Sequence, residues 1–304
     1  MKVVLAGGSG ALGRRIAADL AGRGDDVVIL TRRVRDDLRY RQVVWDGRTP
    51  GPWCDELAGA ALVNLAGEIV DRRPTPANIA LLRSSRVDPT LALAAAARDL
   101  DEPVAAWVQL STLAIYGDAG EPVLDESARP PRDGPPQMVG VATAWEAAAA
   151  EAPADVRQVV LRTAVVLDRE TPALDRLVGV VRWGLGGRIA SGRQWTSWLH
   201  VDDLLAIVRL SLDDPDLRGV VHATAPAPVR NAELMATLRA RLGRPRWAPP
   251  TPAWAVRLGS LVLRTDPMLA LSGRRCVPAR LLERGFRFRY PDLDSALGEL
   301  LGAA

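Results

Sequence analysis

The sequence predicts an α/β protein with a doubly wound parallel sheet, and three observations support that prediction. Short β-branched runs alternate with longer Ala- and Leu-rich segments through the first half of the chain, which is typical of βαβ units. A glycine-rich turn joins the first expected strand to the first expected helix. The 304 residues suit either one large unit or one unit with a smaller appendage.

The expected elements follow the hydrophobic pattern and its breaks. Each expected strand is a Val-, Ile- or Leu-rich run, and the first helix ends at a glycine. The stretch "ESARPPRDGPPQ" (126–137) holds too many prolines for a helix or a central strand, so we expect a surface loop there. The expected strands are 2–7, 26–32, 42–46, 61–67, 105–112 and 157–167, and the expected helices are 13–24, 77–100, 142–152, 231–242, 252–263 and one beginning near Asp202.

Composition narrows the class of protein. A hydrophobic fraction of 48% with a net charge of only +3 indicates a globular chain, and no nucleic-acid reader motif accompanies the arginines, so no nucleic-acid partner is expected. The first apolar run breaks at glycines, and no run of eighteen apolar residues occurs. We therefore expect a cytoplasmic protein with no membrane contact. Two distant cysteines and two histidines predict reduced thiols and no metal site.

The glycine-rich turn reads "AGGSGALG" (6–13), with Gly7, Gly10 and Gly13 between a strand and a helix. Glycine permits a tight turn and close approach of the backbone to a pyrophosphate, and the helix start at Ala11 and Leu12 offers free N–H groups. A purely structural turn is the alternative. The strand, turn and helix in sequence favour dinucleotide binding.

The second expected strand ends in "LTRRVR" (30–35). An NAD enzyme usually carries an acidic residue here for the ribose hydroxyls, whereas Thr31, Arg32 and Arg33 suit a 2′-phosphate. The sequence thus favours NADP(H) over NAD(H). An ordinary Arg-rich surface turn is the alternative, because Lys2 is the only lysine and arginine carries nearly all positive charge.

Polar residues follow two later strands, in "NLAGE" (64–68) and "LSTLAIYG" (110–117). The carboxyl edge of a doubly wound sheet is where ligands bind, so Ser111, Thr112, Tyr116 and Glu68 are candidate site residues. Capping of strand ends and packing of the aromatic ring would explain the same residues without a function.

The stretch "WLHVDDL" (198–204) places His200 beside Asp202 and Asp203. A catalytic pair is one interpretation. We favour the other, in which Asp202 or Asp203 caps the N-terminus of a helix.

Together, "GGSGALG", "NLAGE", "STLAIYGD", "LRTAVVL", "GLGGRIASGRQWTSWLHVDDL" and "PARLLERGFRFRYPDLDSAL" resemble the extended short-chain dehydrogenase/reductase superfamily. The resemblance covers essentially the whole chain, and the last two motifs are similar to an NAD(P)-dependent epimerase-like branch with a C-terminal domain of unknown function. It implies a Rossmann domain over 1–168, returning near 199–225, and a smaller α+β substrate lobe over 169–304 that includes a family-specific region from about 245. It also implies that Thr31, Arg32, Leu65, Ala66, Glu68, Arg86 and Val166 lie near the cofactor. With the motif residues, the expected cofactor-binding set is Gly7, Gly10, Ala11, Leu12, Gly13, Thr31, Arg32, Arg33, Leu65, Ala66, Gly67, Glu68, Arg86, Ser111 and Val166.

One departure from the superfamily lies in "GPPQMVGVATAWE" (134–146). The superfamily acts through a Tyr acid/base and a Lys that lowers its pKa. Here those positions fall at Met138 and Ala142, and the whole stretch lacks both residue types. The epimerase-like branch often lacks the pair as well, so the departure supports the narrower resemblance. Thr112 and Tyr116 remain as candidates for polarising or protonating a carbonyl.

Two hypotheses follow. The first is an NADP(H)-binding oxidoreductase- or epimerase-like protein acting on an unidentified small molecule. The second is a non-catalytic protein that senses NADPH and acts through a protein partner. A closed polar pocket in the C-terminal lobe would favour the first, and an exposed apolar patch near Trp247 and Trp254 would favour the second. A homodimer is compatible with either.

Overall fold

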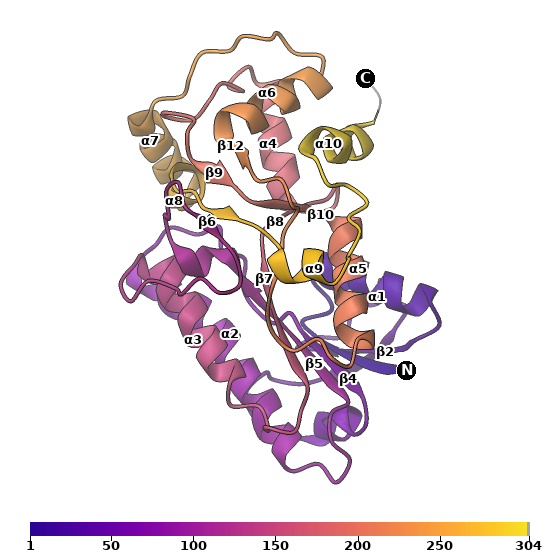
Figure 1. Cartoon of the computed structure of the whole chain (residues 1–304). Coiled ribbons are helices and arrows are strands. Elements are labelled where there is room, and N and C mark those ends of the chain that lie inside the picture. Colours follow the sequence, from indigo (N-terminus) through magenta and orange to yellow (C-terminus); the bar gives the residue numbers. More distant parts are fainter. Residues whose placement is uncertain (303–304) are drawn as a thin grey trace.

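A single parallel sheet of seven strands organises the computed structural model, which describes residues 1–302 (Figure 1). Its order is β3-β2-β1-β4-β5-β7-β11, and every neighbouring pair is parallel. From β1 the chain winds outward to β3, then crosses back to β4 and winds toward the other edge, so the topological switch point lies between β1 and β4. The strands are β1 (Lys2–Ala6), β2 (Asp26–Thr31), β3 (Arg41–Val44), β4 (Ala61–Asn64), β5 (Ala106–Thr112), β7 (Gln158–Thr163) and β11 (Gly219–Ala223).

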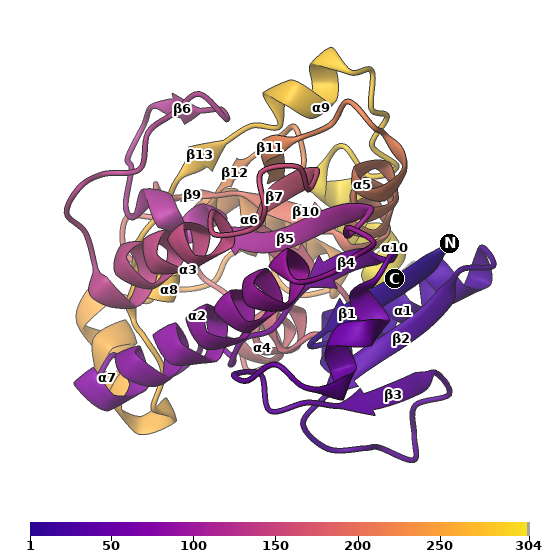
Figure 2. The ribbon, with the colours of Figure 1, turned by 90° about the horizontal axis from the view of Figure 1, so that it is seen from below.

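Helices cover both faces of this sheet, as a doubly wound fold requires. On one face α1 (Ala11–Gly22) packs beside α5 (Val201–Asp213), and on the other α2 (Pro76–Arg98) packs beside α3 (Val141–Ala149) (Figures 1 and 2). Ile16 and Ile207 belong to the hydrophobic core under the first pair, and Leu93 and Trp107 to the core under the second. The predicted fold class is confirmed.

A smaller set of elements surrounds a third core, which contains Trp198, Met235 and Leu297. Its helices are α4 (Pro172–Arg182), α6 (Asn231–Arg241) and α10 (Leu293–Leu301). The later part of the chain also forms α7 (Ala253–Leu263), α8 (Met268–Leu271) and α9 (Ala279–Glu283), and α9 packs on β11 of the large sheet. Two-strand pairs join them: β8 (Val165–Leu167) with β10 (Trp198–His200), β9 (Trp195–Thr196) with β12 (Val229–Arg230), and β6 (Val123–Leu124) with β13 (Arg275–Cys276). The domain division at residue 168 stays a prediction. None of the helices in residues 1–302 has the length and apolarity needed to cross a membrane.

Three expected elements differ from the structure. The strand expected over 61–67 ends at Asn64, and a turn follows it. The strand expected over 157–167 is divided at Ala164, because β7 stays in the large sheet while β8 leaves it to pair with β10. The loop expected over 126–137 ends two residues early, since Pro136–Gly140 forms a π-helical turn ahead of α3. Short 3₁₀ turns occupy Pro52–Leu57 and Leu113–Tyr116.

The N-cap of α5 differs from the residue that the sequence predicts. His200, not Asp202 or Asp203, is the N-cap: its Nδ1 accepts the backbone N–H of Asp202 at 3.0 Å. The buried ring of His200 lies 3.9 Å from that of Tyr290, between ring centroids. Asp203 accepts the backbone N–H groups of Arg289 and Tyr290 at 2.7 and 3.1 Å. These contacts give His200 and Asp203 structural roles, so the cluster does not require a catalytic function.

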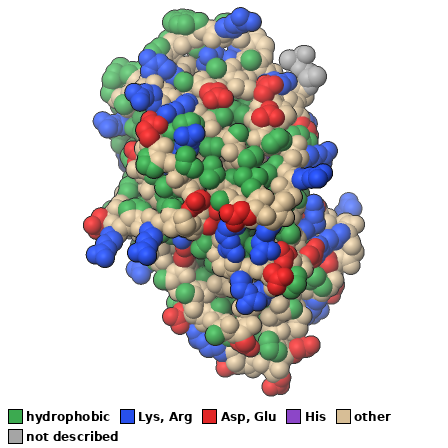
Figure 3. Space-filling model, viewed as in Figure 1, with side chains coloured by type: hydrophobic (Ala, Val, Ile, Leu, Met, Phe, Trp, Pro, Cys, Tyr) green, Lys and Arg blue, Asp and Glu red, His purple; other side chains and the backbone are tan. Residues whose placement is uncertain are grey.

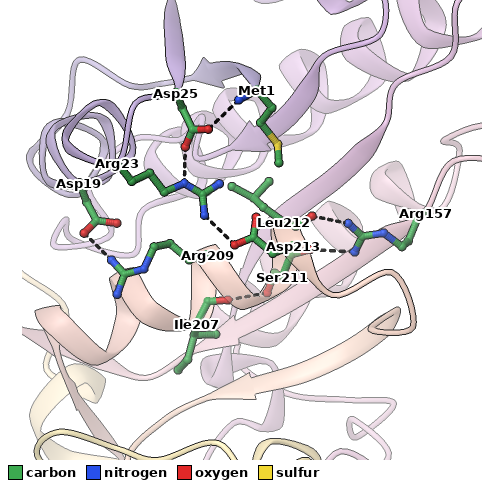
Figure 4. Close-up of polar contacts among 10 residues, drawn as sticks. All are labelled: Met1, Asp19, Arg23, Asp25, Arg157, Ile207, Arg209, Ser211, Leu212 and Asp213. Carbon is green, nitrogen blue, oxygen red and sulfur yellow. Dashed lines mark hydrogen bonds and ion pairs between the residues drawn. The ribbon is translucent and has the colours of Figure 1, made fainter.

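Ion pairs link α1 to α5 across their shared face (Figure 4). The N-terminal ammonium of Met1 lies 2.9 Å from a carboxylate oxygen of Asp25, which also accepts from Arg23. Arg23 also forms an ion pair with Asp213 at the end of α5, with 2.6 Å between Nη1 and Oδ2. The Asp25 side chain is largely buried, whereas Arg23 and Asp213 are partly exposed, so the pair between those two contributes little on its own.

Arg157 makes a different kind of contact at the end of α5. Its guanidinium donates to the carbonyl oxygens of Ser211 and Leu212 at 2.7 Å each (Figure 4). It also donates to the carbonyl oxygen of Leu217 at 3.1 Å. The last carbonyls of a helix have no partner within the helix. Arg157 therefore satisfies acceptors that would otherwise be left without a partner.

We predict that Arg157→Ala lowers the free energy of unfolding by about 1–3 kcal/mol, the cost of leaving partly buried acceptors without donors. Arg209→Ala is the matched control, because it removes only the surface pair with Asp19, worth about 0–1 kcal/mol. Urea unfolding followed by circular dichroism measures both. Equal losses in the two variants would contradict this role for Arg157.

Candidate functional site

Two glycines of the first turn are required by the packing of the backbone. Gly7 has a φ of +82°, and a Cβ on it would lie 2.9 Å from the backbone of Leu65 and Ala66. A Cβ on Gly13 would lie 2.6 Å from Cα of Gly8. These contacts hold the start of α1 against β1 and against the turn after β4.

Gly10 is different, because the space around it is open. A Cβ built on it would meet only the carbonyl oxygen of Gly7, at an ordinary 3.6 Å. Its φ of −75° and ψ of 171° suit any residue, and α1 begins there with no side-chain cap and no acidic residue in its first turn. An uncapped helix N-terminus beside open space is suited to bind an anion such as a pyrophosphate.

The turn after β2 presents two arginines to solvent. Thr31 is buried, and its hydroxyl donates to the carbonyl oxygen of Arg33 at 2.8 Å, which shapes the turn. The exposed side chain of Arg32 has Nη2 3.6 Å from a carboxylate oxygen of Glu68. Arg33 is exposed as well. The turn therefore holds two guanidiniums that can move to a ligand.

The turn after β4 is held by buried polar groups. Asn64 accepts the backbone N–H of Ala66 at 3.1 Å. Arg86, buried on α2, donates to the carbonyl oxygen of Glu68 at 2.9 Å, and its guanidinium lies 5.1 Å from the centre of the Trp145 ring. Burial lowers the pKa of Arg86 to about 10, although the charge of Glu68 opposes that shift.

This geometry gives Arg86 and Gly67 supporting positions in the turn. A Cβ on Gly67 would lie 3.0 Å from the guanidinium carbon of Arg86. The arginine thus packs under the turn 65–68 and fixes its backbone. The expected cofactor contact of Arg86 stays a prediction.

Two hydroxyls, those of Ser111 and Thr112, lie at the end of β5. Ser111 is buried, and its hydroxyl donates to Glu146 on α3 at 2.6 Å. Thr112 is half-buried, and its Oγ1 accepts the backbone N–H of Ala114 at 3.1 Å. Among residues 1–302 no acceptor takes the hydroxyl proton of Thr112. Thr112 therefore keeps a hydrogen-bond donor free at the carboxyl edge of the sheet.

Tyr116 is enclosed rather than presented to solvent. Its hydroxyl lies 2.7 Å from Nη1 of Arg162 and 2.8 Å from Nε2 of His222. Arg162 in turn donates to both carboxylate oxygens of Glu146, at 2.9 and 2.7 Å. His222 Nδ1 lies 3.1 Å from the carbonyl oxygen of Val277, so that nitrogen carries the proton and Nε2 accepts from the phenol.

Burial sets the charge state of this network. It raises the pKa of Tyr116 to about 12, although the Arg162 cation opposes the shift. It also lowers the pKa of His222 to about 4, with the Val277 carbonyl opposing. At pH 7 the phenol and the imidazole are both neutral, and the only charges are those of the Arg162–Glu146 pair.

The positions aligned with the superfamily's Tyr and Lys are apolar. Met138 lies in the π-helical turn and Ala142 in α3, and both are buried. Val166 is buried in β8. A cavity of about 390 Å³ lies nearby, between the two ends of the loop that follows Tyr116, with polar lining from Asp118, Arg129 and Asp133.

Sequence reasoning missed three members of the buried network. Glu146 follows Ala142 by one helical turn, so its place on the sheet-facing side of α3 could have been inferred. Arg162 and His222 lie on β7 and β11. Their approach to Tyr116 depends on strand order, and no local pattern signals it.

The strand order, the switch point and the glycine turn define a Rossmann-type dinucleotide-binding protein. Residues 3–222 match the model of the NAD dependent epimerase/dehydratase family, and residues 251–300 match a domain of unknown function, DUF1731. The chain belongs to this epimerase/dehydratase family. The resemblance to extended short-chain dehydrogenases/reductases is thereby confirmed.

Relatives match over almost the whole length. Epimerase family protein SDR39U1 of Bos taurus is 34% identical, with 99% of this chain and 100% of that protein covered. Epimerase family protein YfhF of Bacillus subtilis is 30% identical, with 99% and 98% covered. The crystal structure of human epimerase family protein SDR39U1 (isoform 2) with NADPH superposes with a TM-score of 0.87 at 32% identity, covering 99% of each chain.

Substitutions at Gly10, which faces open space, and at Gly13, which is tightly packed, should affect different properties. We predict that Gly10→Val leaves the melting temperature near that of wild type but abolishes dinucleotide binding, because the side chain fills the open space at α1. Gly13→Val should cost about 1–3 kcal/mol or more in stability, because its Cβ collides with backbone. Thermal unfolding and cofactor fluorescence check both. A folded Gly10→Val that still binds would refute the phosphate-loop assignment.

Proposed function

We propose that the protein binds NADP(H) in preference to NAD(H) and acts on a small molecule as an oxidoreductase- or epimerase-like enzyme. The observation that carries the proposal is the open face of Gly10 at the uncapped start of α1, with Arg32 and Arg33 beyond the end of the neighbouring strand β2. The human relative whose structure contains NADPH supports the choice of cofactor.

The residues present fit this cofactor. The N–H groups at the start of α1 would hold the pyrophosphate, and the turn at Ala66 would lie along the dinucleotide. Arg32 and Arg33 would hold the 2′-phosphate. Arg32 is free to do so because its contact with Glu68 is long, at 3.6 Å, and Glu68 keeps a second partner in Arg72 at 2.8 Å. When bound, NADP(H) supplies hydride transfer.

Thr112 is the group best placed to act on a substrate carbonyl. Its hydroxyl proton is not taken by any described residue, whereas the Tyr116 phenol is enclosed by Arg162 and His222 and its pKa is raised to about 12. We therefore assign Thr112 to polarising the carbonyl, and Tyr116 to holding the end of β5 in place. Met138 and Ala142 occupy the positions where the superfamily usually has Tyr and Lys, so no side chain at those positions can act as a general acid.

A second function has support from a separate observation. Trp247 and Trp254 are both exposed, as the non-catalytic hypothesis required. In that case the protein would sense NADPH and act through a protein partner. The two functions share the cofactor site and differ in whether turnover occurs.

The arginine after β2 gives the first test. We predict that Arg32→Asp weakens NADPH binding far more than NADH binding, since a charge-assisted contact to the phosphate contributes about 1.5–3 kcal/mol. Arg39→Asp is the control, because it makes the same charge change at an exposed position in the segment that follows. Equal titration curves for NADPH and NADH in the wild-type protein would refute the preference.

The hydroxyls give the second test. We predict little reduction of generic carbonyl substrates by wild type, because the missing general acid is worth about 10²- to 10⁴-fold in rate. Any activity should be lost in Thr112→Val, while Met138→Ala and Ala142→Gly stay near neutral for chemistry. Tyr116→Phe should lower stability more than it lowers the rate per folded molecule. Stopped-flow hydride transfer across a carbonyl panel measures this, and rapid turnover unaffected by either hydroxyl deletion would show that the active site is elsewhere.

A further inference from the structure

The tryptophans divide sharply by exposure. Of the nine in the sequence, six are buried or half-buried, and three are largely exposed: Trp183 at 85%, Trp247 at 76% and Trp254 at 68%. Such exposure is unusual for the largest apolar side chain. All three exposed residues fall within two stretches of the chain, 176–201 and 234–265.

Those two stretches share a second property, which is the sign of their charge. They contain ten arginines and no aspartate or glutamate. Three of the arginines pair with acidic residues elsewhere. Among residues 1–302 no carboxylate pairs with Arg182, Arg244, Arg246, Arg257 or Arg264.

Hydrogen bonds place the two stretches side by side. The backbone N–H of Thr251 donates to the carbonyl oxygen of Arg188 at 2.9 Å, and that of Ala190 donates back to Thr251 at 2.8 Å. The Arg239 guanidinium donates to the carbonyl oxygens of both Gly186 and Arg246. In Figure 3, green and blue side chains gather in the corresponding upper left part of the molecule.

The helix α7 supplies most of the apolar area. Leu258, Leu261, Val262 and Leu263 are all more than half exposed, and Ser260 alone in this helix is buried. The loop that precedes it crosses the top of the molecule, and α7 itself lies at the edge, next to the start of α2 (Figures 1 and 2). We call this area the Trp–Arg surface; it comprises Trp183, Leu185, Trp247, Trp254, the four α7 residues and five of the arginines without a carboxylate partner, namely Arg182, Arg244, Arg246, Arg257 and Arg264.

The charge decides which occupant fits. A second copy of this chain, docked through the same surface about a two-fold axis, would bring arginines against arginines. The partner must therefore have an apolar interior that accepts the exposed tryptophans and leucines, and a negatively charged surface that attracts the arginines. A bilayer with anionic lipids has both properties, since tryptophan favours the headgroup level and arginine favours the negative lipid surface.

We propose that the Trp–Arg surface docks the protein on membranes that contain anionic lipids, with α7 lying in the interface. At eleven residues α7 is far too short to span a bilayer. The inference goes beyond the cofactor site and does not depend on it. It runs counter to the sequence-based expectation of a protein without membrane contact, and the vesicle experiment below decides between the two.

Vesicle binding tests the proposal on the full chain. We expect wild type to bind phosphatidylcholine/phosphatidylglycerol vesicles at least about tenfold more tightly than phosphatidylcholine alone, with a blue shift of tryptophan emission and weakening at high salt. Sedimentation and fluorescence measure both effects. Equal affinity for the two vesicle types, or no binding to either, would overturn the proposal.

Two variants and one control separate the contributions. Trp254→Ser with Leu258→Asp should abolish binding, and Arg246→Glu with Arg257→Glu should remove the preference for anionic vesicles. Arg39→Glu with Arg218→Glu makes the same charge change at exposed positions away from this surface and should bind as wild type. Circular dichroism confirms folding in each case. A concentration-dependent dimer that Leu258→Asp disrupts, with no vesicle binding, would identify a second copy as the occupant and overturn the proposal.

Discussion

The close contact between the Gly8 and Gly13 backbones is the constraint on which the rest of the site depends. Only a residue without Cβ at position 13 lets α1 start so near β1, and only a residue that accepts a φ of +82° at Gly7 lets the chain turn there. Together they aim the positive end of α1 at the switch point between β1 and β4. The open face at Gly10, the arginine turn after β2 and the turn at Ala66 all surround that helix end.

Arginine serves two opposite purposes in this chain. In the interior, Arg86 and Arg162 are buried and satisfied by carbonyl, carboxylate or phenol oxygens, and they hold the turns beside the sheet edge. Removing the partner of such a cation would leave a buried charge, which is costly. On the surface, Arg32 and the arginines around Trp247 and Trp254 have weak or no partners. Those free cations mark where anions bind in this account, a phosphate in one place and a lipid surface in the other.

Local signals in the sequence were enough for the fold class and for the strand, turn and helix that carry Gly7, Gly10 and Gly13; the binding of phosphate there stays a prediction. Strand, turn and helix are encoded within the residues around Gly7, Gly10 and Gly13, so the assignment needed no distant contact. The cap at His200 could not be found in this way, because its ring is held by Tyr290 far along the chain. The surroundings of Tyr116 were missed for the same reason: Arg162 and His222 reach it only through the strand order β5-β7-β11. Partners of long sequence separation determine whether a hydroxyl is free to act.

A crystal structure with NADPH bound is the measurement that tests the central claim most directly. The account predicts the pyrophosphate on the N–H groups at the start of α1, the 2′-phosphate between Arg32 and Arg33, and the Thr112 hydroxyl facing the nicotinamide. It also predicts that the Tyr116 phenol keeps its bonds to Arg162 and His222. Phosphates bound away from Gly10 would contradict the account. A titratable side chain other than Thr112 or Tyr116 beside C4 of the nicotinamide ring would contradict it as well.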